Sequence, residues 1–391
     1  MWGWHGPCFS IGGATMLTRI ARRNLFYDRR RFVAIAAGVC FSVALVLVQL
    51  GLFAGLAENA SQVVDHTPGD IWVMARNTGN FQWGQLMPRR TLSVVRSTPG
   101  VMWAREIVVG WTQLRHPDGG MQQLEVIGFD PTARVGAPWS VVDGTLDELA
   151  IPGRIALDRS AMEKVGAFRV GDHREIRDQR VRIAALSEGI TSFTTVPFVF
   201  TSLGTARALA GYIGPDDTIY VVAGLEPGAS KTAIVAALRA RLRHLDVLSR
   251  ERFSLRTRRY WMFETGMGIG FLLTSSLAIA VGSVIVSQAI YAATNEHFAE
   301  YGTLKAMGMS NASLAAVVIV QGLIAGAVGA LPGCVLGAVV VASARARGLE
   351  AIFAPRLVAA TVVVAWLACA LAAATSVRRV WSLEPALVFR T

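Results

Sequence analysis

Side chains that could carry chemistry are sparse in this chain, and their spacing does not form a reactive site. The segment Gly224–Thr232 (GLEPGASKT) has the composition of a phosphate-binding loop, but it lacks the adjacent Gly-Lys of GxxxxGK[ST]. The six histidines show neither the HExxH pattern nor another close metal-ligand spacing: His5, His66, His116, His173, His244 and His297. We therefore expect no catalytic residue, no metal site and no bound cofactor, so that any ATP must be hydrolysed by another protein.

The most informative pattern lies in Asn295–Ser313 (NEHFAEYGTLKAMGMSNAS), between two long apolar runs. It begins with acidic residues, has a helix-compatible middle and ends in a Gly-Met-Ser-Asn turn. Phe298, Tyr301, Leu304 and Met307 recur at helical spacing. A purely structural turn does not require four exposed apolar side chains, so the pattern favours a face that docks a partner. The alternative is a face that lies on the bilayer.

The runs of sequence that flank and position this segment are long and apolar. Hydrophobic residues make up 53% of the chain, above the ~45–50% of ordinary soluble proteins. A helix needs about 20 apolar residues to cross a bilayer, and the run Phe32–Ala57 contains no charge at all. The sequence predicts four spanning helices, at residues 32–57, 262–293, 312–344 and 357–377.

The polar residues of these runs are few. None of the runs has an ionisable residue at its centre, so the sequence offers no proton relay or ion pathway. Gln49, Gln288 and Gln321 are interpreted as groups that hydrogen-bond between helices. Glycines recur at small-xxx-small spacing, which permits close packing within the chain or across a dimer: Gly51, Gly55, Gly266, Gly270, Gly322, Gly326, Gly329, Gly333 and Gly337.

Basic residues indicate the orientation. The formal net charge is +11, and part of it is concentrated before the first span, where Asp28 is the only acid among six arginines: Arg19, Arg22, Arg23, Arg29, Arg30 and Arg31. This charge pattern is typical of segments that flank a membrane span, and the sequence contains no nucleic-acid recognition motif. We therefore expect membrane lipids as a partner and no nucleic acid. Both termini are then cytoplasmic, which places residues 58–261 outside and makes 345–356 a short external loop. Three arginines in that loop oppose the rule.

The residues before the first span divide into two parts. Residues 16–31 place Leu17, Ile20, Ala21 and Leu25 on one helical face, with the six arginines on the others. We interpret this as a cytoplasmic amphipathic helix anchored on the inner leaflet, the alternative being a solvated basic tail. Residues 1–15 resemble neither a signal peptide nor a helix, because they lack a basic start and contain Gly and Pro. Met16 is therefore expected to be the true start.

The long segment 58–261 alternates strand-like and helix-like patterns, which predicts one large α+β domain inserted between the first and second spans. The expected strands are 70–76, 101–115, 123–129 and 218–222. The expected helices are 88–96, 160–165 and 229–242, and residues 153–172 read as a strand, a helix and a turn. The fold class is thus an α-helical membrane protein with four transmembrane helices and a large extracytoplasmic α+β domain.

The run Glu300–Ser310 (EYGTLKAMGMS) resembles the signature loop of FtsX-like permeases of ABC transporters, the group that includes MacB and the DevC-type exporters. The likeness extends to the ARRNL opening at Ala21–Leu25, the single long external domain, the segment Gly153–Asp172 and the sequence SLEPALVFR within the cytoplasmic tail of residues 378–391. The form EYGTLK is most similar to the DevC-type branch. The residues before Met16 depart from the family pattern.

This resemblance implies a permease of the bacterial inner membrane that dimerises with itself or with a similar subunit. It implies a separate cytoplasmic ATPase, which carries ATP and Mg²⁺, and mechanotransmission to the external domain. A periplasmic adaptor, an outer-membrane channel and lipidic or amphipathic cargo are expected from the DevC-type branch. The residues expected to contact or position the ATPase lie in the loop 294–311: Glu296, Phe298, Glu300, Tyr301, Leu304, Lys305, Met307 and Gly308.

A second interpretation keeps the same topology. The chain would transmit the motion of the ATPase to an external enzyme, such as a cell-wall hydrolase, without moving cargo. The identity of the soluble partner distinguishes this regulator from an exporter, because an adaptor with a long coiled coil favours export and a hydrolase favours regulation.

Overall fold

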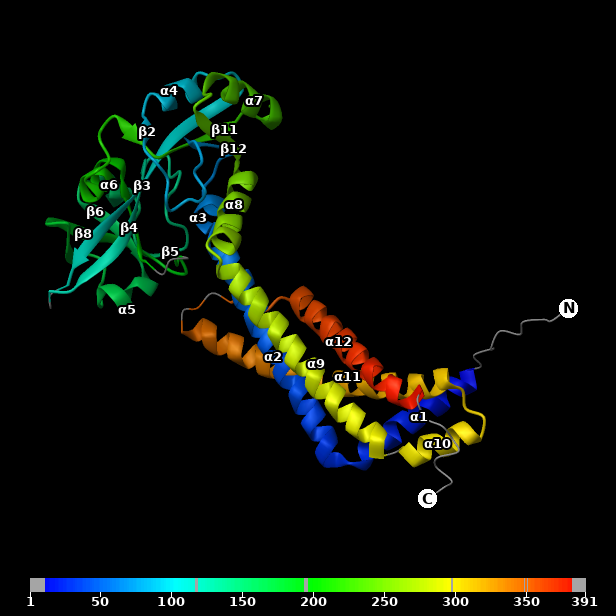
Figure 1. The fold of residues 1–391 in the computed structure, drawn as a ribbon. Helices are drawn as coiled ribbons and strands as arrows, with labels where there is room; N and C mark the ends of the chain where they lie inside the picture. The colour runs from blue at the N-terminus through cyan, green and yellow to red at the C-terminus, as the bar shows by residue number, and fades with distance from the viewer. Residues whose placement is uncertain are drawn as a thin grey trace. The chain divides into compact units, whose positions relative to one another are not determined.

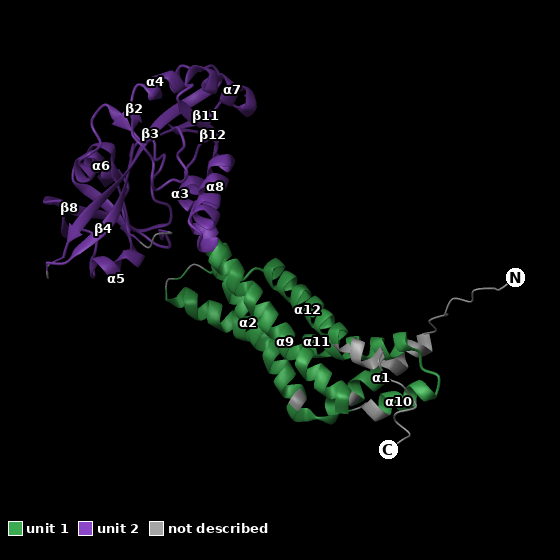
Figure 2. Ribbon diagram, viewed as in Figure 1, with its two compact units in different colours: residues 1–55, 269–391 green, residues 56–268 purple. Residues whose placement is uncertain are grey.

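The computed structural model describes residues 11–116, 119–192, 196–296, 298–347, 349 and 351–381. The chain divides into two compact units, which Figure 2 distinguishes by colour. The helical unit contains residues 1–55 and 269–391, and the sheet unit contains residues 56–268. The inserted position of the sheet unit confirms the predicted fold class.

The described residues of the helical unit form six helices, which Figure 1 labels. Their bounds are α1 (Ile11–Tyr27), α2 (Arg29–Asn59), α9 (Met267–Glu296), α10 (Phe298–Ala306), α11 (Asn311–Ala346) and α12 (Pro355–Trp381). Four of them, α2, α9, α11 and α12, are long and apolar enough to cross a membrane. They correspond to the four apolar runs of the sequence.

Two predicted boundaries in this unit are wrong. The second span does not begin at Met262, because that residue is buried in a π-helical turn, η3 (Tyr260–Glu264), and α9 starts only after Gly266, at a φ of +78°. At the other end, α1 begins at Ile11 rather than at Met16. Glycine lowers helix propensity by only ~1 kcal/mol per residue, so Gly12 and Gly13 do not exclude a helix.

The glycines of α11 bring neighbouring helices into close contact. A Cβ added at Gly329 would lie 2.6 Å from Val39 Cβ, and one added at Gly322 would lie 2.7 Å from Ala373 Cβ. α11 therefore packs on α2 and α12 of its own chain, as small-residue faces do in lipid. Gly326 likewise faces α12, Gly333 and Gly337 face α2, and Gly51 faces the loop at Ile352. A Cβ at Gly270 would meet open space, and Gly266 lies outside the span.

The sheet unit is organised around one large sheet in the order β12-β1-β11-β3-β4-β9-β6-β8-β5, with β7 beside β3 and β8. Its strands are β1 (Ile71–Ala75), β3 (Val101–Arg115), β4 (Met121–Phe129), β5 (Val141–Gly144), β6 (Arg154–Asp158), β7 (His173–Ile176), β8 (Gln179–Ser187), β9 (Phe198–Ser202), β11 (Tyr220–Leu225) and β12 (Leu245–Ser249). A separate pair joins β2 (Met87–Pro88) to β10 (Asp217–Thr218). β4–β9 and β6–β8 are parallel, so the sheet is mixed.

Strand β3 belongs to both halves of the sheet. Its first part, up to Ile107, pairs with β11, and its second part, from Val108, pairs with β4. The first half-sheet therefore comprises β12, β1, β11 and the start of β3, while the second begins with the end of β3. The 15-residue strand was predicted with these bounds because its β-branched and aromatic residues are dense.

Helices cover both half-sheets. They are α3 (Gln62–His66), α4 (Thr91–Arg96), α5 (Met162–Val165), α6 (Leu203–Ala210), α7 (Lys231–Arg241) and α8 (Arg250–Arg259), with the 3-10 turns η1 (Asp147–Ala150) and η2 (Arg159–Ala161). α4 packs on β3 and α7 on β12, whereas α6 packs on β3, β4 and β9.

Two predictions in the sheet unit are corrected. The helix expected at 88–96 starts at Thr91, because Pro88 pairs in β2. The strand expected at 218–222 is divided between β10 and β11, since Thr218 pairs with Met87 whereas Tyr220 pairs in the large sheet. Both errors come from the pair β2–β10, which is too short to produce a pattern.

Candidate functional site

Helix α10 lies within the segment Asn295–Ser313 that was predicted to dock a partner, and it ends in a defined turn. Gly308 adopts a φ of +98°, its N–H donates to Lys305 O at 3.0 Å, and Met309 N–H donates to Leu304 O at 3.1 Å. This pair of bonds is a Schellman motif, which ends a helix and favours glycine at that position. Ser310 then caps α11, its Oγ accepting from Ser313 N–H at 3.2 Å. Gly308 thus positions α10 against α11.

The inner face of α10 is occupied by its own bundle. Tyr301 is only 1% exposed, and its hydroxyl accepts a hydrogen bond from Gln321 Nε2 of α11 at 3.3 Å. Leu304 is half-buried against the same apolar cluster. The prediction that Tyr301 is exposed is wrong, and Leu304 is exposed only in part, because the bundle supplies the apolar cover that the helix needs. The hydrogen bond confirms that Gln321 joins two helices. The side chain of Phe298 lies outside the described part.

The outer face of α10, which we define as Glu300, Thr303, Ala306 and Met307, is exposed. Met307 directly follows the last residue of α10 and is 73% exposed, while the opposite side of the helix is fixed. Methionine is a flexible, polarizable side chain that adapts to partner surfaces. Of the remaining predicted residues, Glu296 is exposed at the end of α9 and Lys305 is half-buried. This surface can bind and position a partner, but it offers no catalytic group.

The amphipathic α1 also turns its apolar face inward. Ala21 and Leu25 are buried in the bundle cluster, and α1 packs against α11. The expectation that this face lies on the inner leaflet is therefore corrected for those two residues, since α11 covers them. The arginines at 19, 22, 23, 29 and 30 are exposed, and the side chain of Arg31 lies outside the described part.

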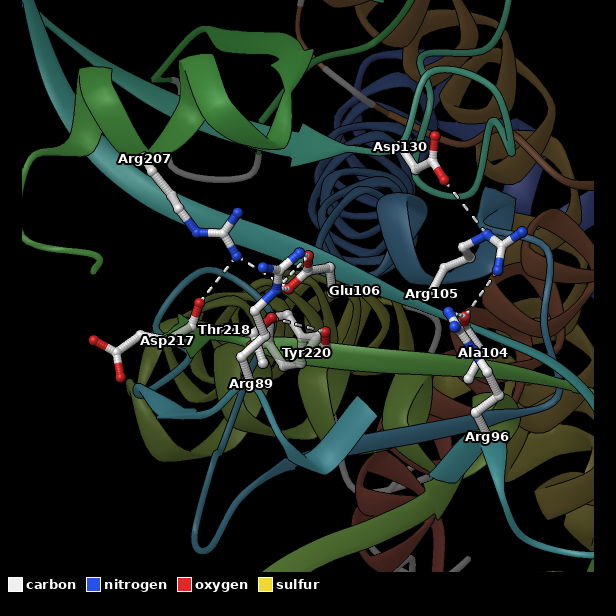
Figure 3. A network of polar contacts seen from close by, with 10 residues as sticks. All are labelled: Arg89, Arg96, Ala104, Arg105, Glu106, Asp130, Arg207, Asp217, Thr218 and Tyr220. Carbon is white, nitrogen blue, oxygen red and sulfur yellow. Dashed lines mark hydrogen bonds and ion pairs between the residues drawn. The ribbon is translucent and has the colours of Figure 1, made fainter. Parts of the chain in front are cut away.

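A second group of polar residues lies in the sheet unit, where β3 passes from one half-sheet to the other. Glu106 is 3% exposed, and its carboxylate accepts from Arg89 Nε at 3.0 Å and from Arg207 Nη2 at 3.0 Å (Figure 3). Arg207, on α6, also donates to Asp217 O at 3.0 Å. Because α6 covers the second half-sheet and Arg89 precedes α4 on the first, this ion triad joins the two halves.

A second connection crosses the same junction. Arg105 Nε lies 3.5 Å from Asp130 Oδ2, just after β4, and Arg105 Nη1 donates to Ala104 O at 3.1 Å. Arg96 Nη2, at the end of α4, donates to the same carbonyl at 3.3 Å (Figure 3). Both connections link the two half-sheets, and we interpret the sheet unit as a single stiff body.

Glu125, on β4, is a buried carboxyl without a hydrogen-bond partner for either oxygen among the described residues. It pairs across from Trp111 on β3 and from Phe198 on β9, in the apolar core. Burial raises the pKa of Glu125 from its ordinary 4.5 to about 8. The protonated form therefore predominates at neutral pH, and a neutral acid costs far less to bury than a carboxylate.

Sequence reasoning missed Glu106 and Glu125. Both residues lie inside strands that were predicted, and an acid within an apolar run is a recognisable signal: VMWAREIVVGW for Glu106 and QQLEVIGF for Glu125. The arginines that pair with Glu106 come from positions 17 and 101 residues away, which no local pattern indicates. The loop residues, by contrast, lie close together in the sequence, but the structure divides them between the buried side of α10, its exposed side and the end of α9.

The chain matches two protein families. Residues 32–241 match the family described as MacB-like periplasmic core domain, more than half of the chain, and residues 272–385 match FtsX-like permease C-terminal. An uncharacterized ABC transporter permease of Mycobacterium tuberculosis is 24% identical over 82% of this chain and 84% of its own length. One of Mycobacterium bovis is 23% identical over 94% of this chain and 98% of its own length.

Solved structures align with about half of the chain. The periplasmic region of MacB from Actinobacillus actinomycetemcomitans aligns with a TM-score of 0.38 at 7% identity, over 50% of this chain and 96% of that one. The extracellular domain of the ABC-type transporter YknZ from Gram-positive bacteria aligns with a TM-score of 0.34 at 12% identity, over 46% of this chain and 98% of that one.

Proposed function

The chain belongs to the ABC transporter permeases of the MacB and FtsX type, and we propose that it couples a separate cytoplasmic ATPase to motion of the sheet unit and to export. ATP and Mg²⁺ would be bound by that ATPase. The membrane is the bacterial inner membrane, with both termini on the cytoplasmic side. This mechanotransmission would drive lipidic or amphipathic cargo outward, together with a periplasmic adaptor and an outer-membrane channel.

The observation that carries the proposal is the division of α10 into two faces. Tyr301 and Leu304 bind the helix to its own bundle, so a force on the outer face moves the bundle rather than the loop alone. The Schellman turn at Gly308 and the cap at Ser310 transmit the position of α10 to α11. α9 leads by chain continuity to the sheet unit, which the ion triad of Glu106 stiffens.

Met307 is the residue that we assign to ATPase contact. Its side chain is 73% exposed, and an apolar group at the centre of an interface often dominates affinity. Glu300 and Thr303 would flank it as polar neighbours on the same face. This assignment replaces Tyr301 and Leu304 as docking residues, while Gly308 keeps a positioning role.

The experiment is a pull-down of the tagged full chain from its native membrane, followed by identification of the partners by mass spectrometry. We expect Met307→Asp to lose most of the ATPase that the wild type recovers, with unchanged extraction and elution of the permease. Met121→Asp is the matched control, because Met121 is 58% exposed in the sheet unit. Equal ATPase recovery with Met307→Asp overturns the docking face, and a wild type without any ATPase overturns the coupling itself.

The same pull-down separates export from regulation. A periplasmic adaptor among the partners supports the exporter, whereas a cell-wall hydrolase recovered in its place contradicts it and favours a regulator without cargo.

Self-association is proposed through the face of α9 that contains Gly270, Leu273 and Leu277. Leu273 and Leu277 are each 64% exposed, and Gly270 leaves room for a close approach. The glycines of α11 are already used within the chain. Cysteine cross-linking in membranes at Leu273, with Leu371 of α12 as the control position, tests this. Cross-linked dimers at Leu371 alone would contradict it.

A further inference from the structure

A partly open cavity of about 20 Å³ lies in the helical unit and is lined by residues of α2, α9 and α12. Its lining is mostly apolar, with valine, isoleucine and alanine side chains from all three helices. Three hydroxyl-bearing residues also line it, namely Ser42 on α2, Ser283 on α9 and Thr361 on α12. All lie within the long apolar segments, where water from outside is not available to a polar group.

Two of these hydroxyls have no hydrogen-bond partner among the described residues. Ser42 is 8% exposed and Thr361 is 3% exposed, and neither Oγ of Ser42 nor Oγ1 of Thr361 has a donor or acceptor within reach. Serine and threonine in membrane helices ordinarily bond to the carbonyl of the preceding turn, as Ser283 does with Ile279 O at 2.8 Å. An unsatisfied hydroxyl in such surroundings costs ~1–3 kcal/mol, so two beside one cavity require an explanation.

One of these hydroxyls, that of Ser42, packs closely against the backbone of α9 at Gly282. A Cβ added at Gly282 would lie 2.2 Å from Ser42 Oγ and 2.9 Å from Ser42 Cβ. Only glycine leaves this space to the serine hydroxyl. The close approach therefore keeps Ser42 Oγ at the wall of the cavity.

We propose that the cavity holds one water molecule, which bridges Ser42 Oγ and Thr361 Oγ1. A cavity needs about 10–15 Å³ to hold a water, and the water needs two to four polar partners. The volume meets the first requirement, and the two orphan hydroxyls meet the second. Ser283 Oγ, which donates to Ile279 O, still has lone pairs and can accept a third bond from the water.

Such a bridge joins three helices at the cavity, in addition to the direct hydrogen bond between Ser287 Oγ of α9 and Thr375 Oγ1 of α12 at 2.7 Å. α2 and α12 are linked through the water, and α9 supplies the glycine wall and the third oxygen. A bridging water is nearly as favourable as a direct hydrogen bond and can reorient when its partners shift. The inference does not depend on the proposed function, because it concerns only the interior of the helical unit.

The test asks whether removing either hydroxyl lowers or raises Tm. Ser42→Ala and Thr361→Val, in the full chain in nanodiscs, each remove one partner of the proposed water. With the water present, each change should lower Tm by roughly 2 °C, and the double variant should lose less than the sum because either change already weakens the bridge. If the hydroxyls are dry, removing them relieves a buried unsatisfied group and raises Tm, which overturns the proposal.

Ser275→Ala is the matched control. Ser275 lies on α9, is 5% exposed and has an orphan hydroxyl, but it does not line the cavity. We expect this change to leave Tm unchanged or to raise it. A similar fall in all three single variants would indicate a general packing effect and would contradict a water at this site.

A density map of the wild type provides the direct observation. A single spherical peak within hydrogen-bond distance of Ser42 Oγ and Thr361 Oγ1 confirms the water. An empty cavity, or an elongated density that continues as a lipid chain, overturns it.

Discussion

The two units bury polar groups in opposite ways. Among its described residues, the sheet unit buries three carboxyl groups: Glu106 is paired with two arginines, Asp158 accepts three hydrogen bonds, and Glu125 is held neutral by its raised pKa. The long helices of the helical unit bury no Asp, Glu, Lys or Arg among their described residues, and their buried polar groups are hydroxyls and two amides, Gln321 on α11 and Asn59 at the end of α2. In this unit, close backbone contact at glycines replaces charge pairing.

The difference follows from the solvent that each unit replaces. In water, a buried ion pair is tolerable when its geometry is good, and losing one partner costs several kcal/mol. In lipid, there is no hydrophobic force between helices, so tight packing and uncharged hydrogen bonds hold them. The comparison predicts that the helical unit is most sensitive to added volume and the sheet unit to lost charge partners.

The largest expected effect is that of added volume in α11. Gly329→Leu places a side chain where Val39 Cβ and Ala36 O already lie within 2.8 Å of the first added carbon. We expect the free energy of unfolding to fall by about 3 kcal/mol or more, which is the upper end for overpacking. Little folded protein should then be recovered. Size-exclusion chromatography of the extracted chain measures the folded fraction. Gly270→Leu on the open face of α9 is the control, and equal losses in both variants would refute the comparison.

The next effect concerns lost charge in the sheet unit. Glu106→Leu leaves Arg207, whose side chain is 14% exposed, without its carboxylate. We expect a destabilisation of roughly 3 kcal/mol, at the low end for a broken buried pair because Arg89 is half-exposed. Urea unfolding followed by tryptophan fluorescence measures it. Asp147→Asn, at the exposed Arg134 pair, should cost under about 1 kcal/mol, and a comparable cost there would contradict the assignment.

A pH-dependent effect sharpens the comparison. Because the folded-state pKa of Glu125 is raised from 4.5 to about 8, only the unfolded chain ionises it between these values. Its contribution to stability is therefore fully present below pH 4.5 and is lost as the pH rises toward 8, by at most ~1.4 kcal/mol per pH unit. Tyr212 and Tyr220 interact electrostatically with it, and burial raises the pKa of both.

We expect Glu125→Gln to remove this slope. Urea unfolding measures the free energy of unfolding at pH 6 and at pH 8. Between these pH values it should fall by up to about 2 kcal/mol more in the wild type than in the variant. Glu148→Gln, at a half-exposed position, is the control and should keep the slope of the wild type. Parallel slopes in wild type and Glu125→Gln would show that Glu125 does not titrate in this range.

The smallest expected effect is that of one hydrogen bond. Tyr301→Phe leaves Gln321 Nε2, 2% exposed, without its phenol partner and should cost ~1 kcal/mol. Replacing both, with Tyr301→Phe and Gln321→Leu, should recover part of that loss because no unsatisfied amide remains. Thermal unfolding of the single and double variants measures the difference. A double variant less stable than the single one would show that the amide has another role.

The sequence was sufficient where one local property decides the structure. The uncharged run Phe32–Ala57 exceeds a bilayer thickness, and Val101–Arg115 is dense in β-formers, so both elements were predicted. The sequence was insufficient where the structure depends on which of several possible surfaces covers an apolar face. The apolar face of Tyr301 and Leu304 could have met lipid, a partner or its own bundle, and only the arrangement of the helices distinguishes these. The triad of Glu106 depends on residues from three distant segments.

The continuity of β3 has a consequence for unfolding. A strand of 15 residues spans roughly 50 Å, and its amide protons lie in hydrogen bonds with β11 at one end and with β4 at the other. Neither half-sheet can open without leaving part of this strand unpaired. The two halves should therefore constitute one cooperative unit in native-state hydrogen exchange, with amides of Arg105 and Thr112 exchanging through the same global event rather than through separate openings.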